Sequence, residues 1–328
     1  MRAVVISQPG GPEVLEVREV PDPTIGPDEL LVRVEASALN RADLLQRRGL
    51  YPAPAGCPKD TPGLELAGTV VAVGARVTRF GPGARVMGLV GGGAAAELAV
   101  LHEREALAVP TGLSVTEAAA IPEAFMTAFD AIILQGGLQG GQWLALDAAA
   151  SGVGTAAVQI ARALGAHSLG STRTAAKLDR LAALGLDRGV CGTTADLAAA
   201  ARALPGAGAA VALSLVGGAT TPDLLAALRP GGTAVLVGLM AGAKAELPLG
   251  AILQRRLRLI GTVLRSRPLE EKIALARAFE DRLLPFFGGA APRLVAVVDQ
   301  TFPLSAVAAA HAALEANTSV GKIVLTHG

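Results

Sequence analysis

The sequence predicts an α/β protein in which a doubly wound parallel sheet is inserted into a β-rich domain. Short β-rich segments run from Met1 to about Gly112, strand and helix patterns alternate over 143–263, and strand patterns return near the C-terminus. A chain of 328 residues suits two domains. We expect one domain at 1–117 with 264–328 and the other at 118–263.

The first 112 residues carry the pattern of a mostly antiparallel, partly closed sheet. Pro, Gly and Asp punctuate the β-rich runs, as is typical of such sheets. The expected strands are 3–6, 15–20, 30–36, 68–73 and 97–100. A helix is expected over 40–49, and the proline-rich segment 50–63 is a loop long enough to suggest a functional role.

The middle of the chain alternates between strands and helices. Helical patterns begin near Thr116 and at Pro122, the second running toward Leu134. The expected strands that follow are 143–148, 168–171, 188–191, 209–215, 233–238 and 258–263. Six parallel strands with helices between them form a complete dinucleotide-binding sheet.

The last 65 residues depart from this alternation. We expect a long helix over 268–287 with Ser266 as its cap, a strand at 294–298, a helix at 305–316 and a strand at 322–325. These elements exceed the six-strand count, so they are expected to complete the first domain.

The stretch that organises the chain is a glycine turn between a buried strand and an amphipathic helix. Residues 152–157 fit the pattern G-x-G-x-x-G/A, with Gly152, Val153 and Gly154 at its start. In a Rossmann domain the first glycine permits the tight turn, and the second lets backbone approach a pyrophosphate at the helix N-terminus. An ordinary strand-to-helix turn is the alternative, because a chain rich in Gly and Ala also produces such turns by chance.

Composition excludes several classes of function. The net charge is +1 and there is no basic run, so no nucleic-acid partner is expected. The uncharged stretch 203–222 is interrupted by Pro205 and several glycines, so no membrane span is expected. Cys57 and Cys191 offer no disulfide framework, and the N-terminus is typical of a first strand rather than a signal peptide, which together favour a cytoplasmic protein.

The residues after the second strand of the inserted domain indicate which dinucleotide binds. An NAD site wants an acidic residue about twenty positions past the glycine turn. This chain offers Ser171, Arg173 and then Lys177, with no carboxylate between Asp147 and Asp179. The sequence therefore predicts NADPH, with Arg173 binding the 2′-phosphate; solvated helix-end cations are the alternative.

Several motifs together resemble one known family. They are GGPEVLEV, SALNRADLLQRRGLYP, PGLELAGTVVAVG, AAAIPEAFMTAF, ASGVGTAAVQIARALGA, LVGLM, TVLRSR and VGKIVL. They resemble the zinc-free, zeta-crystallin-like quinone oxidoreductases of the medium-chain dehydrogenase/reductase superfamily, and within them the tumour-suppressor-inducible branch. The resemblance covers nearly the whole chain. It implies a GroES-like catalytic domain with an inserted Rossmann domain, a homodimer, and a site in the cleft between the domains.

The resemblance also implies which residues bind the cofactor. Asn40 is expected at the nicotinamide ribose, although it could equally cap the helix after it. Lys177 matches the family motif, and Lys322 is expected to hold the C-terminal strand to the cofactor cleft, an exposed turn lysine being the alternative. The remaining expected cofactor contacts are Thr127, Ser151, Val216, Gly238, Leu239, Met240, Leu264 and Ser266.

A catalytic zinc ion is not expected. Zinc-dependent relatives place a Cys near the position of Asn40 and a His-Glu pair where this chain has Leu64 and Glu65. A sulfur or imidazole ligand is therefore missing at both positions, and three ligands cannot be assembled.

Reduction of a quinone without a metal needs a group that stabilises or protonates the oxygen that gains negative charge. Two hydroxyls are expected to do so: Ser151, and Tyr51, the one tyrosine of the chain. Tyr51 could instead cover the cleft without taking part in the chemistry. The predicted function is NADPH-dependent reduction of quinones; the alternatives are an alkenal or enone double-bond reductase and a nucleotide-binding protein with little turnover.

A second copy of the chain is the predicted partner. The apolar segment 257–263 would form the edge of the parallel sheet, and a bare edge strand invites pairing. A homodimer through this edge is therefore expected.

Overall fold

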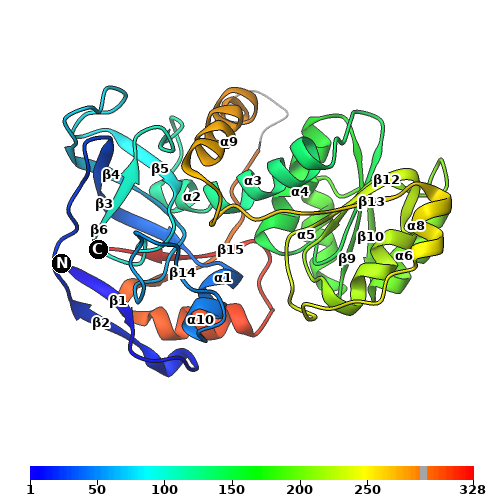
Figure 1. Cartoon of the computed structure of the whole chain (residues 1–328), viewed down its shortest axis with the longest axis horizontal. Coiled ribbons are helices and arrows are strands. Elements are labelled where there is room, and N and C mark those ends of the chain that lie inside the picture. Colours follow the sequence, from blue (N-terminus) through cyan, green and yellow to red (C-terminus); the bar gives the residue numbers. More distant parts are fainter. Residues whose placement is uncertain (289–293) are drawn as a thin grey trace. The chain divides into compact units, whose positions relative to one another are not determined.

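The computed structural model describes residues 1–288 and 294–328 and divides into two compact units (Figure 1). Met1–Met126 with Leu264–Gly328 form the first unit, and Thr127–Val263 form the second. The sequence placed the first boundary at 117/118. Residues 118–126 belong instead to the first unit, where the backbone N–H of Glu123 donates to the buried carboxylate of Glu65 (2.8 Å).

A seven-stranded, mainly antiparallel sheet forms the first unit, in the order β14-β15-β3-β4-β5-β7 with β6 paired to β3. A separate antiparallel pair, β1 and β2, contacts it through a bridge between Ala3 and Ala96. The strands are β1 (Arg2–Ile6), β2 (Leu15–Glu19), β3 (Glu29–Ala38), β4 (Glu65–Val73), β5 (Arg85–Leu89), β6 (Leu98–His102), β7 (Leu107–Ala108), β14 (Val298–Pro303) and β15 (Lys322–Thr326). Alternate residues of β3, such as Leu30 and Val32, are fully buried, as expected for a sheet with one face on the core.

The helices of the first unit are short, apart from α9. They are η1 (Pro12–Val14), α1 (Arg41–Arg47), α2 (Val115–Ala119), the start of α3 (Pro122–Phe129), α9 (Leu269–Arg282), η4 (Leu284–Phe286), η5 (Leu304–Ala306) and α10 (Val307–Glu315). α10 packs its apolar face, including Val307 and Leu314, against Ile323 of β15 and Leu44 of α1. The chain therefore returns from the second unit to complete the core of the first.

Two predictions for residues 264–328 were wrong. Ser266 does not cap α9, because the N-cap position is taken by Pro268, whose ring fixes φ just before the first turn. The strand expected at 294–298 lies instead at Val298–Pro303, because that segment is the one in register with β15. Strands β5 and β7 were not predicted.

The second unit is a six-stranded parallel sheet in the order β10-β9-β8-β11-β12-β13. In sequence order this is 3-2-1-4-5-6, the arrangement of dinucleotide-binding domains. The strands are β8 (Trp143–Leu146), β9 (His167–Thr172), β10 (Arg188–Cys191), β11 (Ala209–Ser214), β12 (Leu228–Leu236) and β13 (Arg258–Gly261). All six strands predicted for this sheet are present.

Helices connect these strands. They are the end of α3 with the π-helical turn η2 (Asp130–Gln135), α4 (Gly152–Ala163), α5 (Ala176–Leu184), α6 (Thr194–Arg202), η3 (Gly218–Thr220), α7 (Thr221–Ala226) and α8 (Leu249–Arg255). Leu144, Ala145 and Leu146 of β8 are 0% exposed, because the strand is central and covered on both faces. β8 ends earlier than predicted, since Ala148 adopts a left-handed conformation (φ 44°).

Candidate cofactor and active site

The glycine turn between β8 and α4 closes tightly on itself. Ser151 is the N-cap of α4, and its hydroxyl accepts a hydrogen bond from the Gly154 N–H (3.1 Å). A Cβ on Gly154 would lie 2.5 Å from the Ala149 oxygen and 2.7 Å from the Ala148 oxygen. Gly154 is therefore required to close the turn, a role that the sequence analysis gave to the first glycine.

The N-terminus of α4 can hold an anion. The backbone N–H groups of Gly152 and Val153 have no acceptor among the residues that the structure describes. Unpaired N–H groups and the helix dipole both favour negative charge at this end of a helix. A pyrophosphate therefore fits the turn.

The turn lies where the strand order of the sheet reverses. β8 and β11 flank this switch point, and open α/β sheets bind ligands there, at the carboxyl ends of the strands. Val216 follows β11, and Gly238 follows β12 with the exposed Leu239 and Met240 after it. These four residues lie at the same edge of the sheet as the glycine turn.

β9 holds a buried serine, and two cations follow the strand. Ser171 is 4% exposed, and its carbonyl accepts from the Ala149 N–H (3.0 Å), so it supports the glycine turn. Arg173 is exposed directly after β9, and Lys177 is half-buried in the first turn of α5. The exposed guanidinium of Arg173 is suited to a phosphate.

The remaining predicted residues divide between the units. Thr127 is buried in α3 of the second unit, whereas the first unit holds Asn40, Tyr51, the buried Leu264, the exposed Ser266 and Lys322.

Asn40 takes the N-cap position of α1, and its side chain bonds to residues outside the helix. The carboxylate of Asp43 accepts from the Asn40 N–H (2.7 Å) and from the Gly63 N–H (2.9 Å). Burial raises the pKa of Asp43, and these two bonds oppose that shift. The Asn40 amide donates to Glu65 (2.9 Å) and accepts from Lys322 (2.5 Å). Its N-cap position fits the helix-cap alternative, and the expected contact with the nicotinamide ribose stays a prediction.

Lys322 is buried, not an exposed turn residue. Its side chain is 5% exposed, and its ammonium group meets the Leu39 carbonyl (2.8 Å), the Asn40 side chain and the Glu65 carboxylate (2.7 Å). These three acceptors match its three N–H groups. Lys322 therefore orients Asn40 and has no N–H left for a further acceptor.

Glu65 is a residue whose role the sequence analysis missed. Its carboxylate is fully buried and joins β4 to Lys322 and Asn40 while accepting from the N-terminus of α3 through Glu123. From the sequence, Glu65 stood out only beside Leu64, at the position where zinc-dependent relatives have a His-Glu pair.

Tyr51 is paired with Arg265, a second residue that the sequence analysis missed. The guanidinium lies 5.0 Å from the centre of the Tyr51 ring and donates to the Tyr51 carbonyl (3.2 Å) and to Gln46 (2.6 Å). Burial raises the pKa of Tyr51, so its hydroxyl is a proton-bearing donor at neutral pH. That hydroxyl has no hydrogen-bond partner in residues 1–288 and 294–328. Arg265 lies in the TVLRSR motif, between the predicted cofactor contacts Leu264 and Ser266.

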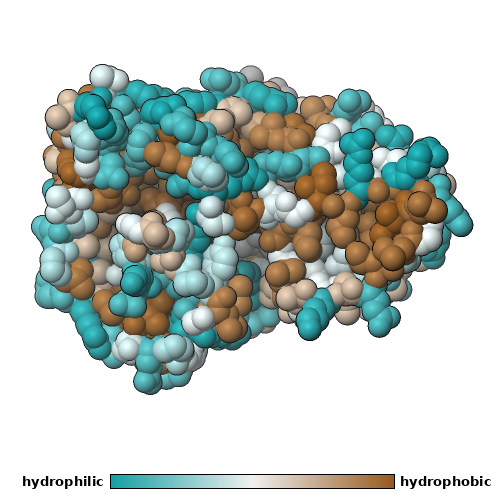
Figure 2. Space-filling model, in the orientation of Figure 1, coloured by the Kyte–Doolittle hydropathy of each residue, from teal (hydrophilic) through white to brown (hydrophobic). Residues whose placement is uncertain are grey.

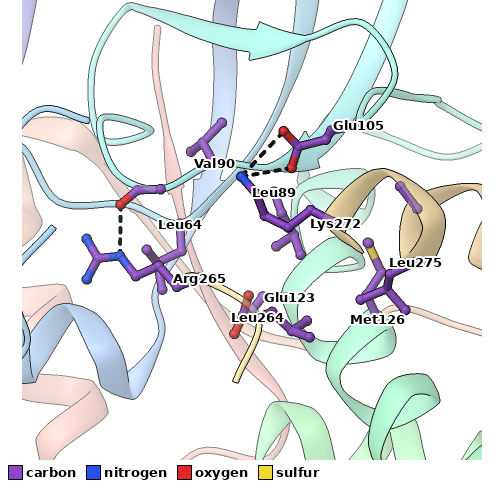
Figure 3. Close-up of a pocket in the computed structure, with 12 residues that line it drawn as sticks. Leu64, Leu89, Val90, Glu105, Glu123, Met126, Leu264, Arg265, Lys272 and Leu275 are labelled. Carbon is purple, nitrogen blue, oxygen red and sulfur yellow. Dashed lines mark hydrogen bonds and ion pairs between the residues drawn. The ribbon is translucent and has the colours of Figure 1, made fainter. Parts of the chain in front are cut away.

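Arg265 also borders a pocket of the first unit (Figure 3). Its guanidinium donates to the Gly91 carbonyl (2.8 Å), and Leu64, Met126 and Leu264 supply apolar surface nearby. A partly buried ion pair between Lys272 and Glu105 (3.2 Å) lines another side. The pocket combines an apolar lining with a few charged groups.

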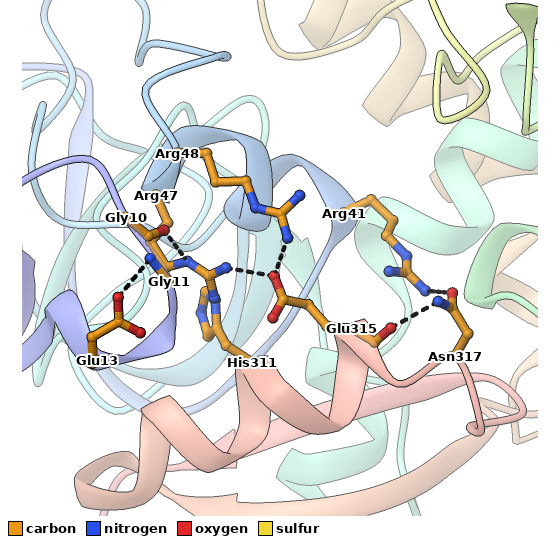
Figure 4. Close-up of polar contacts among 9 residues, drawn as sticks. All are labelled: Gly10, Gly11, Glu13, Arg41, Arg47, Arg48, His311, Glu315 and Asn317. Atoms are coloured by element: carbon orange, nitrogen blue, oxygen red, sulfur yellow. Dashed lines mark hydrogen bonds and ion pairs between the residues drawn. The ribbon is translucent and has the colours of Figure 1, made fainter.

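A buried network fixes the end of α1, from which the Tyr51 loop departs (Figure 4). Arg47 is 0% exposed and donates to the Gly10 carbonyl (3.0 Å), to Nδ1 of His311 (3.3 Å) and to Glu315 (2.5 Å). Burial, with the adjacent Arg47 charge, lowers the pKa of His311 to about 4. His311 is therefore neutral at pH 7 and serves as an acceptor.

Comparison with known proteins places the chain in a family. Residues 26–111 match the alcohol dehydrogenase GroES-like domain, and residues 152–280 match the family described as zinc-binding dehydrogenase. A quinone oxidoreductase of Pseudomonas aeruginosa is 34% identical over 96% of this chain and 96% of its own length. The chain belongs to the quinone oxidoreductase family of the medium-chain dehydrogenase/reductase superfamily. It is therefore an oxidoreductase.

Solved structures of related enzymes agree with this fold. The quinone oxidoreductase of Thermus thermophilus, also described in complex with NADPH, is 33% identical with a TM-score of 0.83 over 99% of this chain and all of its own. The CurK enoyl reductase is 25% identical with a TM-score of 0.88 over all of this chain and 99% of its own. The chain also aligns with a polyketide synthase component, PikAII of Streptomyces venezuelae, at 38% identity over 70% of its residues, but it spans only 6% of that protein.

The described residues offer neither a membrane-spanning helix nor a metal-binding cluster. None of their helices is both long and apolar enough to cross a membrane. No group of three or more His, Cys, Asp or Glu side chains in that part of the chain could hold a metal ion.

Proposed function

We propose that the protein is an NADPH-dependent, zinc-independent reductase that delivers a hydride to quinones. The observation that carries the proposal is the glycine turn at the switch point of a complete dinucleotide-binding sheet, with two unpaired N–H groups and an exposed arginine beside it. Family membership supports the oxidoreductase chemistry.

The residues present fit the cofactor. The backbone of Gly152, Val153 and Gly154 would hold the pyrophosphate. Arg173 and Lys177 would face the 2′-phosphate, where no carboxylate from 148 to 178 would repel it. The other proposed contacts are Asn40, Thr127, Ser151, Ser171, Val216, Gly238, Leu239, Met240, Leu264 and Ser266, with Lys322 acting through Asn40. NADPH, when bound, supplies the hydride.

The residues of this chain would manage the negative charge that reduction leaves on the substrate oxygen. Tyr51 offers an O–H group with no other partner among the described residues, and Arg265 beside its ring adds a positive charge. The Ser151 oxygen already accepts from Gly154, so its own proton is available for donation. A hydroxyl donor that reaches a developing oxyanion stabilises it.

The enone double-bond reductase is the second candidate, because the CurK enoyl reductase has the same fold over the full chain. A nucleotide-binding protein with little turnover is the third. Turnover with quinone and enone panels distinguishes all three.

Cofactor choice gives the first prediction. Wild type is expected to oxidise NADPH with quinones far faster than NADH, and Arg173→Ala to lose about tenfold in kcat/KM for NADPH because a charge-assisted contact is removed. The loss of nicotinamide absorbance measures both rates. Arg202→Ala, an exposed arginine at the end of α6, is the control and should change neither rate. Equal rates with both cofactors would contradict the NADPH assignment, and no turnover with any acceptor would leave only the nucleotide-binding protein.

The hydroxyl of Tyr51 gives the second prediction. Tyr51→Phe keeps the ring on Arg265 and removes only the donor, so kcat is expected to fall about a hundredfold with KM nearly unchanged. Steady-state kinetics with a quinone measures both constants. A raised KM with intact kcat would show that Tyr51 only positions the substrate.

We also propose a homodimer through the edge strand β13. The strand lies at the end of the sheet; Leu259 within it is 38% exposed, and Val263 just after it is 46% exposed. On α8, Leu249 and Leu253 are 71% and 79% exposed, and Figure 2 shows apolar surface gathered over this part of the second unit. An unpaired edge beside an apolar patch favours pairing with a second copy.

Sedimentation tests this dimer as the third prediction. Wild type is expected to sediment as a dimer, and Leu253→Glu to sediment largely as a monomer, because a charge would be buried in the interface. A monomer at every concentration of wild type would contradict the proposal.

A further inference from the structure

Asp147 is a buried carboxylate at the switch point that none of the chemistry above uses. It follows directly after β8 and is 2% exposed. One oxygen accepts from the Leu215 N–H (2.6 Å) and the other from the Val216 N–H (3.3 Å). Leu215 and Val216 are the first residues after β11, so the carboxylate bridges the carboxyl ends of the two strands that flank the crevice.

The bridge reaches three segments at this edge of the sheet. On its own side, Asp147 leads into the glycine turn through the left-handed Ala148. Across the switch point, the Val216 carbonyl accepts from the Ala241 N–H (2.9 Å), which ties the turn after β11 to the loop that carries Leu239 and Met240. Hydrogen bonds and chain continuity therefore connect all three segments to Asp147 and the Leu215–Val216 turn.

We propose that Asp147 is a positioning residue that fixes the turn after β11 in its cofactor-binding conformation, and that only its ionised form does so. The inference rests on the proposed NADPH site.

The ionisation requirement follows from the geometry of the two bonds. A carboxylate accepts at both oxygens, whereas a protonated carboxyl group turns an O–H donor toward one of the two N–H groups. Burial raises the pKa of Asp147 to about 7, and the bonds from Leu215 and Val216 are what opposes the shift. No charged side chain from the glycine turn, from β11 or from the loop after β12 is among the groups that set this pKa. The hydrogen bonds by which Asp147 fixes the turn after β11 are therefore expected to weaken as the pH falls through neutrality.

Amide chemical shifts test the hydrogen bond from Leu215 to Asp147 in the absence of any ligand. The amide proton of Leu215 in ¹⁵N-labelled apo protein is expected to move with a midpoint near pH 7 in wild type and to stay fixed in Asp147→Asn. The asparagine variant keeps one acceptor and buries no charge, so it should fold. A Leu215 amide that does not titrate in wild type would overturn the proposal.

Cofactor affinity tests the consequence. Dissociation constants for NADPH and NADH are measured by calorimetry about 1.5 pH units below and above neutrality. Wild type is expected to bind both nucleotides about tenfold more weakly at the lower pH, and Asp147→Asn to show the weak affinity at both values. NADH is included because it lacks the 2′-phosphate, whose own ionisation would otherwise mimic the effect.

Asp187→Asn is the matched control. Asp187 accepts from the Ser168 N–H (2.8 Å) at the opposite, amino-terminal end of the same sheet, so its loss should not change the pH profile. If Asp147→Asn binds both nucleotides like wild type, the positioning role is overturned while the NADPH site stands. If wild type binds neither nucleotide at any pH, the proposed function fails, whatever the Leu215 amide shows.

Discussion

Replacing Lys322 by methionine is expected to lower the free energy of unfolding by about 3–5 kcal/mol. The substitution leaves the Glu65 carboxylate, which is 0% exposed, without its cation at 2.7 Å. It also removes the donor that Asn40 and the Leu39 carbonyl share. Breaking a buried pair on one side costs more than the pair contributes, because an uncompensated charge remains. Denaturant unfolding, compared through midpoints at constant slope, measures the loss.

Two further variants separate the ion pair from a general effect of the substitution. Lys244→Met exchanges the same side chains at an exposed position and should change stability by no more than about 0.5 kcal/mol. Combining Glu65→Gln with Lys322→Met removes both charges, so this double variant should lose less stability than Lys322→Met alone. A Lys322→Met protein as stable as Lys244→Met would contradict the assignment of Lys322 to a buried pair.

The parts of the fold set by local pattern could be predicted from the sequence. The strand, turn and helix around Gly152 and Gly154 follow from residues within about twenty positions of one another, and the six parallel strands follow from alternating periodicities. The pairing of 298–303 with β15 could not be predicted in the same way. The run 294–298 is as apolar as a strand, and only the register with Lys322–Thr326 decides which segment pairs.

The contacts of the site show the same division. Tyr51 and Ser151 could be named because they lie in or beside recognisable motifs. The contacts between distant parts of the chain could not be named: Arg265 stacks on Tyr51, and Lys322 pairs with Glu65. Neither spacing is periodic, so no sequence pattern predicts which cation meets which partner. Asp147 was noticed only as a carboxylate before a gap in acidic residues, because its role depends on a turn that follows a different strand.

Acid stability gives the second large effect, through His311. Its pKa is about 4 in the folded protein and about 6.5 in the unfolded chain, so between these values only the unfolded chain takes up the proton. The stabilising contribution of neutral His311 is therefore complete above about pH 6.5 and is lost as the pH falls toward 4, by about 3 kcal/mol. His311→Gln keeps an acceptor for Arg47 but cannot take up a proton. The stability advantage of wild type over His311→Gln is expected to shrink or reverse on acidification, as measured by denaturant unfolding across this range.

The comparison between the two proteins isolates His311 from other titrating groups. His327, whose pKa burial also lowers to about 4, destabilises both proteins equally on acidification. Asp147 acts in the opposite direction, because its raised pKa makes the folded state take up a proton first, and it too is present in both. His167→Gln replaces a histidine whose side chain is 48% exposed and serves as the control. A stability difference between wild type and His311→Gln that stays constant with pH would show that His311 is not held neutral by burial beside Arg47.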